Sequence, residues 1–366
     1  MDVSLIYEIS TPDVHDQGQV RQAYQEATEQ VELADQLGYR CVWLTEHHFM
    51  PGLSHSPSPE TTLAYWAGRT KNIRLGHGVT LLPAGINHPV RVAERTATLD
   101  LLSGGPLEFG GGRAITVAEL EAFGIDPEDS RSQWEEAFKL IPHAWTADTF
   151  SWQGKWVQFP ERELTPKPVQ KPHPPLWTAA TQPATLELAG KMGLGALVFG
   201  VGYELVAEYN AIYRKALQDA NPVGQFVNDK FAGFLMTMCA PSDDEAVSIQ
   251  GHNYKHYLHN IGELFTPWKD GAPKSYEYFL NFWKQAQPQL EQATMEEIVA
   301  MGSAAIGSPD TVLGVMQKMA DSGADEVLLF MQAYDAPHEA VMRSIELIAK
   351  EVMPKLEKRT PAAATA

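Results

Sequence analysis

Short apolar runs alternate along the chain with longer segments in which apolar residues recur every three or four positions. The first of these segments carries Val20, Tyr24, Ala27, Val31 and Ala34. This spacing places the five side chains on one face of a helix, whereas an apolar run of four to eight residues is typical of a buried strand. The pattern therefore predicts strands and helices in regular alternation.

Eight strands and the helices that follow them can be placed from this pattern. The predicted strands span residues 3–9, 40–44, 73–82, 107–109, 175–180, 196–199, 231–239 and 326–331. Further helices are predicted at residues 59–70, 89–102, 132–145, 183–192, 204–217, 308–319 and 339–355. Such alternation is typical of parallel βαβ units, and eight pairs close a (β/α)8 TIM-type barrel. A doubly wound sheet is the rival, but no strand–GxGxxG–helix unit or Walker A sequence stands where that fold needs one.

Two segments interrupt the alternation and are predicted to be insertions in a single domain of residues 1–359. The first, about 114–174, follows strand 4 and includes a hairpin that turns at Gln153-Gly154. The second, about 250–301, follows strand 7 and is rich in aromatic residues, which suit a lid over an apolar pocket or a packed peripheral helix. Small residues without apolar periodicity predict a disordered tail at 360–366.

The composition restricts the class of protein. The 366 residues carry a net charge of −18 at pH 7, which opposes binding to a nucleic-acid backbone. No apolar stretch reaches the length of a membrane span and the N-terminus lacks a basic signal region, so a cytoplasmic protein is expected. Cys41 and Cys239 lie far apart in apolar runs and are interpreted as free thiols in a reducing compartment.

Two histidines close the second predicted strand, in the sequence Thr45-Glu46-His47-His48-Phe49. The carboxyl ends of barrel strands form the active-site rim, so polar residues there are catalytic candidates. Adjacent strand residues face opposite ways. At most one of His47 and His48 should therefore point into the mouth of the barrel, while the other braces it; the alternative is that both are hydrogen-bonded core histidines.

Two further strand ends suit an anion. Strand 4 runs into Gly110-Gly111-Gly112-Arg113, where backbone can approach a ligand and arginine can bind phosphate. Strand 5 runs through Ala180 into a predicted helix start at 181–185, a natural phosphate position. The alternatives are a surface charge at Arg113 and simple helix capping by Thr181.

Three histidines near residue 255 and the carboxylate of Glu119 are further candidates for a chemical role. His252, His256 and His259 share one helix face, but no carboxylate joins them in a zincin pattern, so no metal site is predicted. Glu119 follows Arg113 by six residues, near enough to orient a catalytic base or to pair with Arg113.

Taken together, the motifs make the chain similar to the bacterial luciferase-like flavin monooxygenases over nearly its whole length. The matching segments, in order, are residues 42–49, 81–83, 88–91, 109–113 and 307–309. Each segment is weak alone, and their order and spacing carry the resemblance.

The resemblance implies a site at the carboxyl rim of a barrel that is usually dimeric. FMN would bind there, with Arg113 and the turn formed by Ala180, Thr181, Gln182 and Thr185 on its phosphate. His47 falls on the catalytic histidine of the luciferases, and Gly78-Val79 on a non-proline cis peptide. Gly112 replaces a reactive cysteine near the flavin, so light emission is not implied, and Glu119 stands where luciferase has an aspartate.

By the same resemblance, a separate flavin reductase would supply reduced FMN. A C4a-peroxyflavin formed with O2 would then oxygenate a small hydrophobic substrate, with His47 as general acid or base and Glu119 beside it. Three alternatives stay open: a deazaflavin (F420)-dependent or flavin-linked dehydrogenase, a non-catalytic flavin-binding partner subunit, and a metal-dependent barrel hydrolase.

Overall fold

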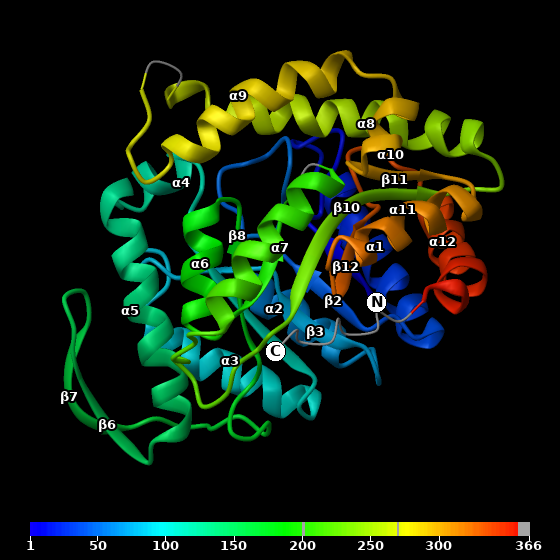
Figure 1. The fold of residues 1–366 in the computed structure, drawn as a ribbon. Helices are drawn as coiled ribbons and strands as arrows, with labels where there is room; N and C mark the ends of the chain where they lie inside the picture. Colours follow the sequence, from blue (N-terminus) through cyan, green and yellow to red (C-terminus); the bar gives the residue numbers. More distant parts are fainter. Residues whose placement is uncertain (200–201, 269–270, 358–366) are drawn as a thin grey trace.

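A closed barrel of eight parallel strands forms the centre of the molecule (Figure 1). The computed structural model describes residues 1–199, 202–268 and 271–357. The barrel strands are β1 (Asp2–Tyr7), β2 (Cys41–Leu44), β3 (Arg74–His77), β5 (Leu107–Gly112), β8 (Leu176–Ala180), β9 (Gly195–Val198), β10 (Phe231–Cys239) and β12 (Glu326–Phe330). Each pairs with the next in this order, and β12 pairs in parallel with β1 to close the ring. The predicted (β/α)8 fold and all eight strands are confirmed.

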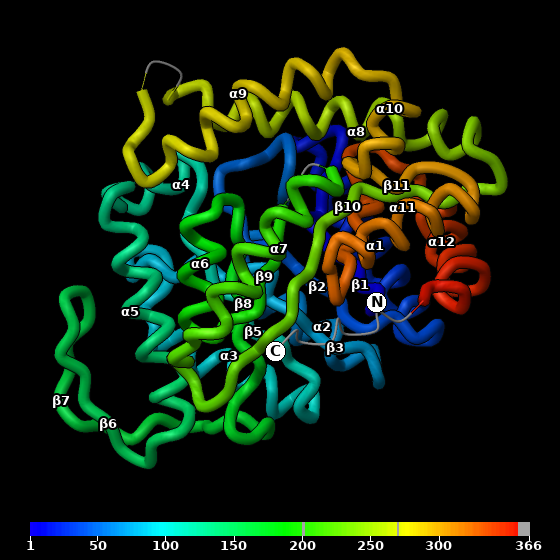
Figure 2. Tube along the Cα trace, in the orientation of Figure 1, coloured from blue at the N-terminus to red at the C-terminus, as the bar shows by residue number. Residues whose placement is uncertain are grey.

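Helices cover the outside of the barrel, as the tube in Figure 2 shows. They are α1 (Gln17–Leu37), α2 (Pro59–Ala67), α3 (Pro89–Ser103), α6 (Pro183–Lys191), α7 (Tyr203–Leu217), α11 (Pro309–Asp321) and α12 (His338–Leu347). The buried residues of α1 include Ala27, Val31 and Ala34, on the face that the spacing predicts. The last helix was predicted to run through 339–355, but α12 gives way to a π-helix, Ile348–Val352, and a 3₁₀ turn, Met353–Lys355, the latter around Pro354, which cannot donate an N–H to an α-helix.

The third strand is shorter than predicted. β3 ends at His77, and the short strand β4 (Thr80–Leu81) pairs with β5 beyond it. The Gly78-Val79 peptide between them is cis, as the resemblance implied.

The glycine run after strand 4 is strand rather than the predicted loop, since β5 continues to Gly112. A Cβ at Gly110 would collide with the carbonyl oxygen of His77, and one at Gly111 with the side chains of Leu82 and Phe138. The missing side chains therefore let β5 pack tightly against its neighbours.

The first insertion contains α4 (Val117–Ala122), α5 (Pro127–Thr146) and a hairpin, β6 (Thr149–Gln153) with β7 (Gln158–Glu163). The hairpin stands away from the barrel (Figure 2). Its turn spans 154–157 and is closed by Gly154 N–H donating to the Val157 carbonyl at 3.0 Å, not a two-residue turn at Gln153-Gly154. The reason is a carboxylate on α5, because Glu136 Oε1 accepts the Val157 N–H at 2.9 Å.

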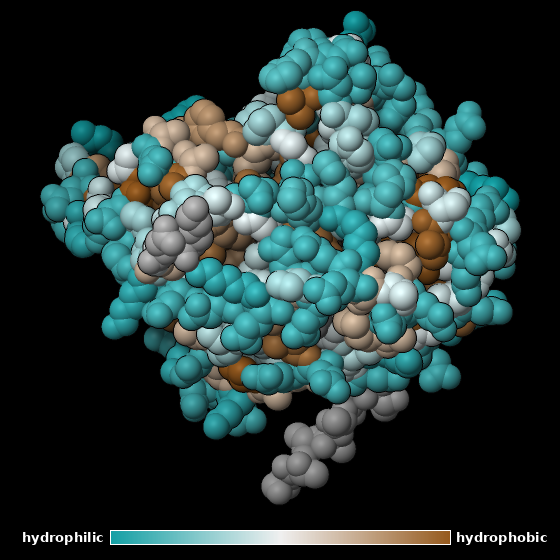
Figure 3. All heavy atoms as spheres, turned by 90° about the horizontal axis from the view of Figure 1, so that it is seen from above, coloured by the Kyte–Doolittle hydropathy of each residue, from teal (hydrophilic) through white to brown (hydrophobic). Residues whose placement is uncertain are grey.

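The second insertion lies over the carboxyl ends of the strands. It extends beyond the predicted 250–301, because its first helix, α8, spans Asp243–Leu264 and its last element, β11, spans Ala304–Gly307 and pairs with β10. Between them lie η1 (Thr266–Trp268), α9 (Glu277–Gln292) and α10 (Met295–Met301). α8 and α9 run side by side (Figure 1), and their outward surface is mostly hydrophilic (Figure 3). Phe279 and Trp283 face inward and are almost fully buried, so these helices roof the barrel mouth.

Two further sequence predictions concern the C-terminal tail and membrane-spanning helices. The tail predicted to be disordered, 360–366, lies outside the described residues. Within the described ranges, none of the helices has both the length and the hydropathy that crossing a membrane requires.

Candidate active site

Two adjacent pockets, which share lining residues, lie between the carboxyl ends of the strands and the helices of the second insertion. The larger, a cavity of about 200 Å³, is lined mostly by apolar side chains from the barrel strands, α8 and α9. The smaller lies toward α5 and α6 and is richer in polar groups. The residues that line both are Arg113, Ile115, Ala179, Thr181 and Phe279. One elongated ligand could therefore occupy the two pockets together.

His47 lines the larger pocket, just beyond the end of β2. Its Nδ1 lies 3.4 Å from Glu119 Oε1. Among the described residues no side chain is bonded to Nε2, so this ring nitrogen can face a ligand. The ring of His48 is held elsewhere, with Nε2 3.1 Å from Glu46 Oε1 and an edge contact to Phe123. Of the two histidines, His47 is therefore the one that lines the pocket, although both lie beyond β2 and not in a strand; its catalytic role stays a prediction.

Glu119 is fixed from both sides. Its side chain is fully buried; Oε1 accepts the His48 N–H at 3.0 Å and Oε2 accepts the Thr116 hydroxyl at 3.0 Å. Thr116 and Glu119 form the capping box that starts α4. Of the two roles considered for Glu119, the geometry matches the orientation of a base, because its side chain contacts His47 rather than Arg113.

This contact shifts the pKa of both groups. Burial lowers the pKa of His47, but the hydrogen bond that its ring N–H donates to Glu119 and the charges of Glu119, Glu8 and Glu46 outweigh it, so the pKa is raised. Burial raises the pKa of Glu119, but the hydrogen bond and charge of His47 outweigh it, so that pKa is lowered. The pair therefore favours a protonated imidazole beside a carboxylate.

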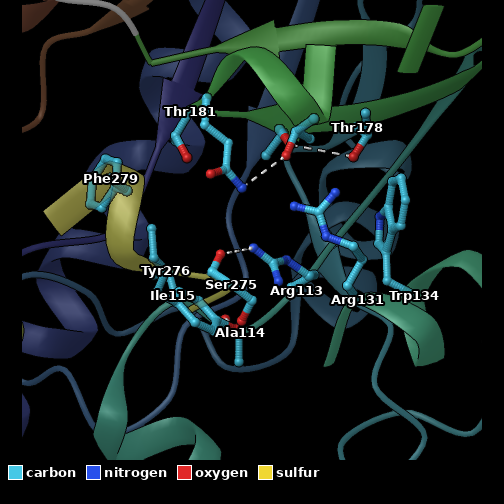
Figure 4. A pocket seen from close by; sticks show the side chains of 14 residues that line it. Arg113, Ala114, Ile115, Arg131, Trp134, Thr178, Thr181, Ser275, Tyr276 and Phe279 are labelled. Carbon is cyan, nitrogen blue, oxygen red and sulfur yellow. Dashed lines mark hydrogen bonds between the residues drawn. The ribbon is translucent and has the colours of Figure 1, made fainter. Parts of the chain in front are cut away.

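The smaller pocket holds two arginines, Arg113 from the end of β5 and Arg131 from α5 (Figure 4). Arg113 donates to Ser130 Oγ and to the Ser275 carbonyl, both at 3.3 Å, and its guanidinium lies 4.6 Å from the centre of the Tyr276 ring. Burial and the neighbouring charge of Arg131 help to lower the pKa of Arg113. An anion between the two cations would relieve their repulsion.

The start of α6 completes this pocket. Its N-cap is Gln182, which makes no side-chain capping bond, so capping by Thr181, the alternative considered from sequence, does not occur. Thr181, Gln182 and Thr185 all line the smaller pocket. The uncapped N–H groups and the dipole of α6 suit an anion beside the two arginines. Ala179, rather than the predicted Ala180, is the alanine that lines both pockets.

The cis peptide lies beside the glycine-rich end of β5. Gly78 and Val79 line the larger pocket and Gly112 the smaller one. A Cβ at Gly112 would collide with the side chain of Val79. A cysteine there, as in the luciferases, would therefore require Val79 to move.

Among the lining residues that the sequence did not reveal are Glu8, Arg131 and Tyr257. Glu8 follows β1 directly, so a polar residue at a strand end could have marked it, as for His47; the first strand was predicted to continue to Ile9, which hid it. Arg131 and Tyr257 lie on the insertion helices α5 and α8, and no local pattern distinguishes them from surface residues.

Two of the three histidines of α8 have other partners. His252 Nε2 lies 2.6 Å from Asp335 Oδ1, and the ring of His256 stacks on Tyr334. In the ranges that the structure describes, no three His, Cys, Asp or Glu side chains converge as metal ligands do.

Comparison with known proteins identifies the protein family. Residues 4–326 match the luciferase-like monooxygenase family, and this chain belongs to that family.

Individual relatives extend this likeness. The chain is 30% identical to limonene 1,2-monooxygenase of Rhodococcus erythropolis over 331 residues, 89% of this chain and 80% of that one. It is 33% identical over 187 residues to the oxygenase component of a flavin-dependent trigonelline monooxygenase of Acinetobacter baylyi, 50% of this chain and 51% of that one. The fold is shared with the oxygenating constituent of 3,6-diketocamphane monooxygenase from Pseudomonas putida, solved with FMN, at a TM-score of 0.79 and 22% identity, covering 98% and 99% of the two chains.

Proposed function

We propose that this protein is the oxygenase component of a two-component flavin-dependent monooxygenase, which uses reduced FMN and O2 to oxygenate a small, largely hydrophobic organic molecule. The observation that carries the proposal is that two unlike pockets adjoin. A cationic pocket with the uncapped start of α6 shares five lining residues with an apolar one that has His47 on its wall.

The residues present fit FMN. Arg113, Arg131 and the start of α6 would hold its phosphate, since arginine and helix N-termini both favour phosphate. The ring system would extend into the larger pocket, beside the Gly78-Val79 peptide. When bound, the reduced flavin would supply the activation of O2, through the C4a-peroxyflavin implied by the family resemblance.

The chain itself would orient the reactants, exclude water and move one proton. α8 and α9 roof the site with apolar side chains, which would keep water from the reacting atoms. His47 would donate or accept a proton at Nε2, while Glu119 holds Nδ1 and thereby fixes the ring.

The proposal includes a flavin reductase, a homodimer and a cytoplasmic location. The name of the trigonelline relative, an oxygenase component, supports a separate reductase. Tyr65 on α2 and Leu101 and Leu102 on α3 are large, exposed apolar side chains on two helices in contact, and such a face suits a second copy of the chain. The buried free cysteines Cys41 and Cys239 fit a reducing compartment.

The first experiment mixes the purified protein with photoreduced FMN, admits O2 in a stopped-flow spectrometer and follows the flavin absorbance. We expect an oxygenated flavin species that outlives the one formed in free solution, because the roofed pocket excludes water. Arg113→Ala, which weakens the phosphate pocket, serves as the control and should shorten its lifetime. Reoxidation at the rate of free FMN would contradict the proposal and favour the F420-dependent dehydrogenase or the non-catalytic subunit.

A further inference from the structure

A buried carboxylate on the wall of the larger pocket has no role in the function proposed above. Glu8 follows β1 directly, is only 7% exposed and lines the cavity. Tyr257, on α8, donates its hydroxyl to Glu8 Oε1 at 3.0 Å. Within the part of the chain that the structure describes, no protein group donates a hydrogen bond to Oε2 of Glu8, and this oxygen is not one of the fully buried atoms without a partner, so it is open to the cavity. A buried carboxylate with one free oxygen is costly unless another group partners it.

The other carboxylates near the pocket are fully used. Glu46 accepts the Leu81 N–H at 2.8 Å with one oxygen and the Asn87 amide at 2.7 Å with the other, which also contacts His48. Glu119 is matched by His47 and by backbone donors. Glu8 is therefore the lining carboxylate, among the described residues, that remains available to a ligand.

The cations of the site lie elsewhere or have partners of their own. Arg113 and Arg131 line the smaller pocket, which Arg113 shares with the larger one, and His47 pairs with Glu119. Burial raises the pKa of Glu8, and the charge of His47 and the hydrogen bond from Tyr257 lower it by less, so the carboxyl gains from any further positive partner. Around it the wall is apolar, with Ile6 and Phe234 beside Glu8 and Tyr257 in the same pocket.

We infer that Glu8, oriented by Tyr257, selects substrates that combine an apolar body with a basic nitrogen. The ammonium or heteroaromatic N–H would donate to the free Oε2, while the body packs in the apolar part of the cavity. This inference rests on the proposed function and deepens it, because it names the substrate class that the same site takes. Glu8 is here a recognition residue and takes no part in the oxygen chemistry.

The test compares three probes with one body and different head groups, namely phenylbutylamine, phenylbutanol and phenylbutyrate. Their affinities for the FMN-loaded protein are measured by calorimetry at neutral pH. We expect the amine to bind about tenfold or more tightly than the butyrate, as a charge-assisted hydrogen bond would give. In Glu8→Gln this ratio should fall close to one, whereas Glu121→Gln, an exposed substitution on α4, should leave it unchanged.

Three results would overturn the inference. In the unaltered protein, phenylbutyrate could bind as tightly as phenylbutylamine, or phenylbutylamine could fail to bind up to its solubility. In Glu8→Gln, the ratio of the two affinities could stay unchanged. The first two need no variant, so a failure of Glu8→Gln to fold leaves the inference open to refutation. The stopped-flow reaction of reduced FMN distinguishes the two proposals. If the oxygenated flavin is long-lived but the three probes bind equally well, only the role of Glu8 is refuted. If the probes show the expected preference but the oxygenated flavin is short-lived, only the monooxygenase proposal is refuted.

Discussion

At the scale of single residues, the contact between His47 and Glu119 makes a testable statement about protonation. Glu119→Gln removes the charge and the strong acceptor at Nδ1, so we predict that the pKa of His47 falls. The side chain of Gln keeps the size, which leaves the pocket intact. Histidine NMR titration measures the shift, with His47→Asn identifying the resonance. Glu121→Gln, exposed on the same short helix, should leave the titration unchanged.

The same pair predicts how stability depends on pH. The folded pKa of His47 is raised from 6.5, so its contribution is complete below 6.5 and lost as pH rises through the folded pKa. The folded pKa of Glu119 is lowered from 4.5, so its contribution is complete above 4.5 and lost as pH falls through the folded pKa. The stability difference between the unaltered protein and Glu119→Gln should therefore peak between 4.5 and 6.5. A difference that does not vary with pH would contradict the ion pair.

At the scale of elements, the smaller pocket depends on three segments that meet, namely the end of β5, α5 and the start of α6. We predict that Arg113→Ala and Arg131→Ala each weaken FMN binding about tenfold to a hundredfold, which is the worth of a charge-assisted contact. Riboflavin, which lacks the phosphate, should bind the variants as it binds the unaltered protein. Fluorescence titration of both flavins measures the effect.

Lys139→Ala is the matched control, because Lys139 is exposed on the same helix as Arg131 and should change neither affinity. Equal losses for FMN and riboflavin would show that the arginines support the fold rather than the phosphate.

The elements also show what a sequence can predict. Periodicity predicted every barrel strand, because strand and helix repeats differ and each barrel unit repeats the same pattern. Strand ends then placed His47 and Arg113 on one rim, since parallel strands end on the same side. The hairpin turn was predicted wrongly because Glu136, on another element, decides it. The place of Arg131 and Tyr257 in the site was not predicted for the same reason, because it depends on how the insertion helices dock on the barrel.

At the scale of the whole molecule, the two ends of the barrel have different roles, one in ligand binding and the other in stability. The carboxyl end carries the pockets, and a buried ionic cluster closes the opposite end. There, near the start of β5, Glu108 is 1% exposed. One of its oxygens accepts from Arg40 at 2.8 Å and Arg74 at 2.6 Å, and the other from the indole N–H of Trp177 at 2.7 Å. Barrel enzymes generally separate stability and catalysis in this way.

Glu108→Ala tests that division. The change leaves two guanidinium groups and an indole N–H without their shared partner, so we expect a loss of about 3 to 5 kcal/mol in the free energy of unfolding, as for a broken buried ion pair. FMN affinity and turnover per folded molecule should stay the same, because the cluster lies at the end of the barrel opposite the pockets. Urea unfolding and flavin titration of the same preparation measure both. Glu187→Ala, which breaks the exposed pair with Lys191, should leave stability unchanged. A fall in FMN affinity with Glu108→Ala at full folding would instead show that the two ends are coupled through the strands.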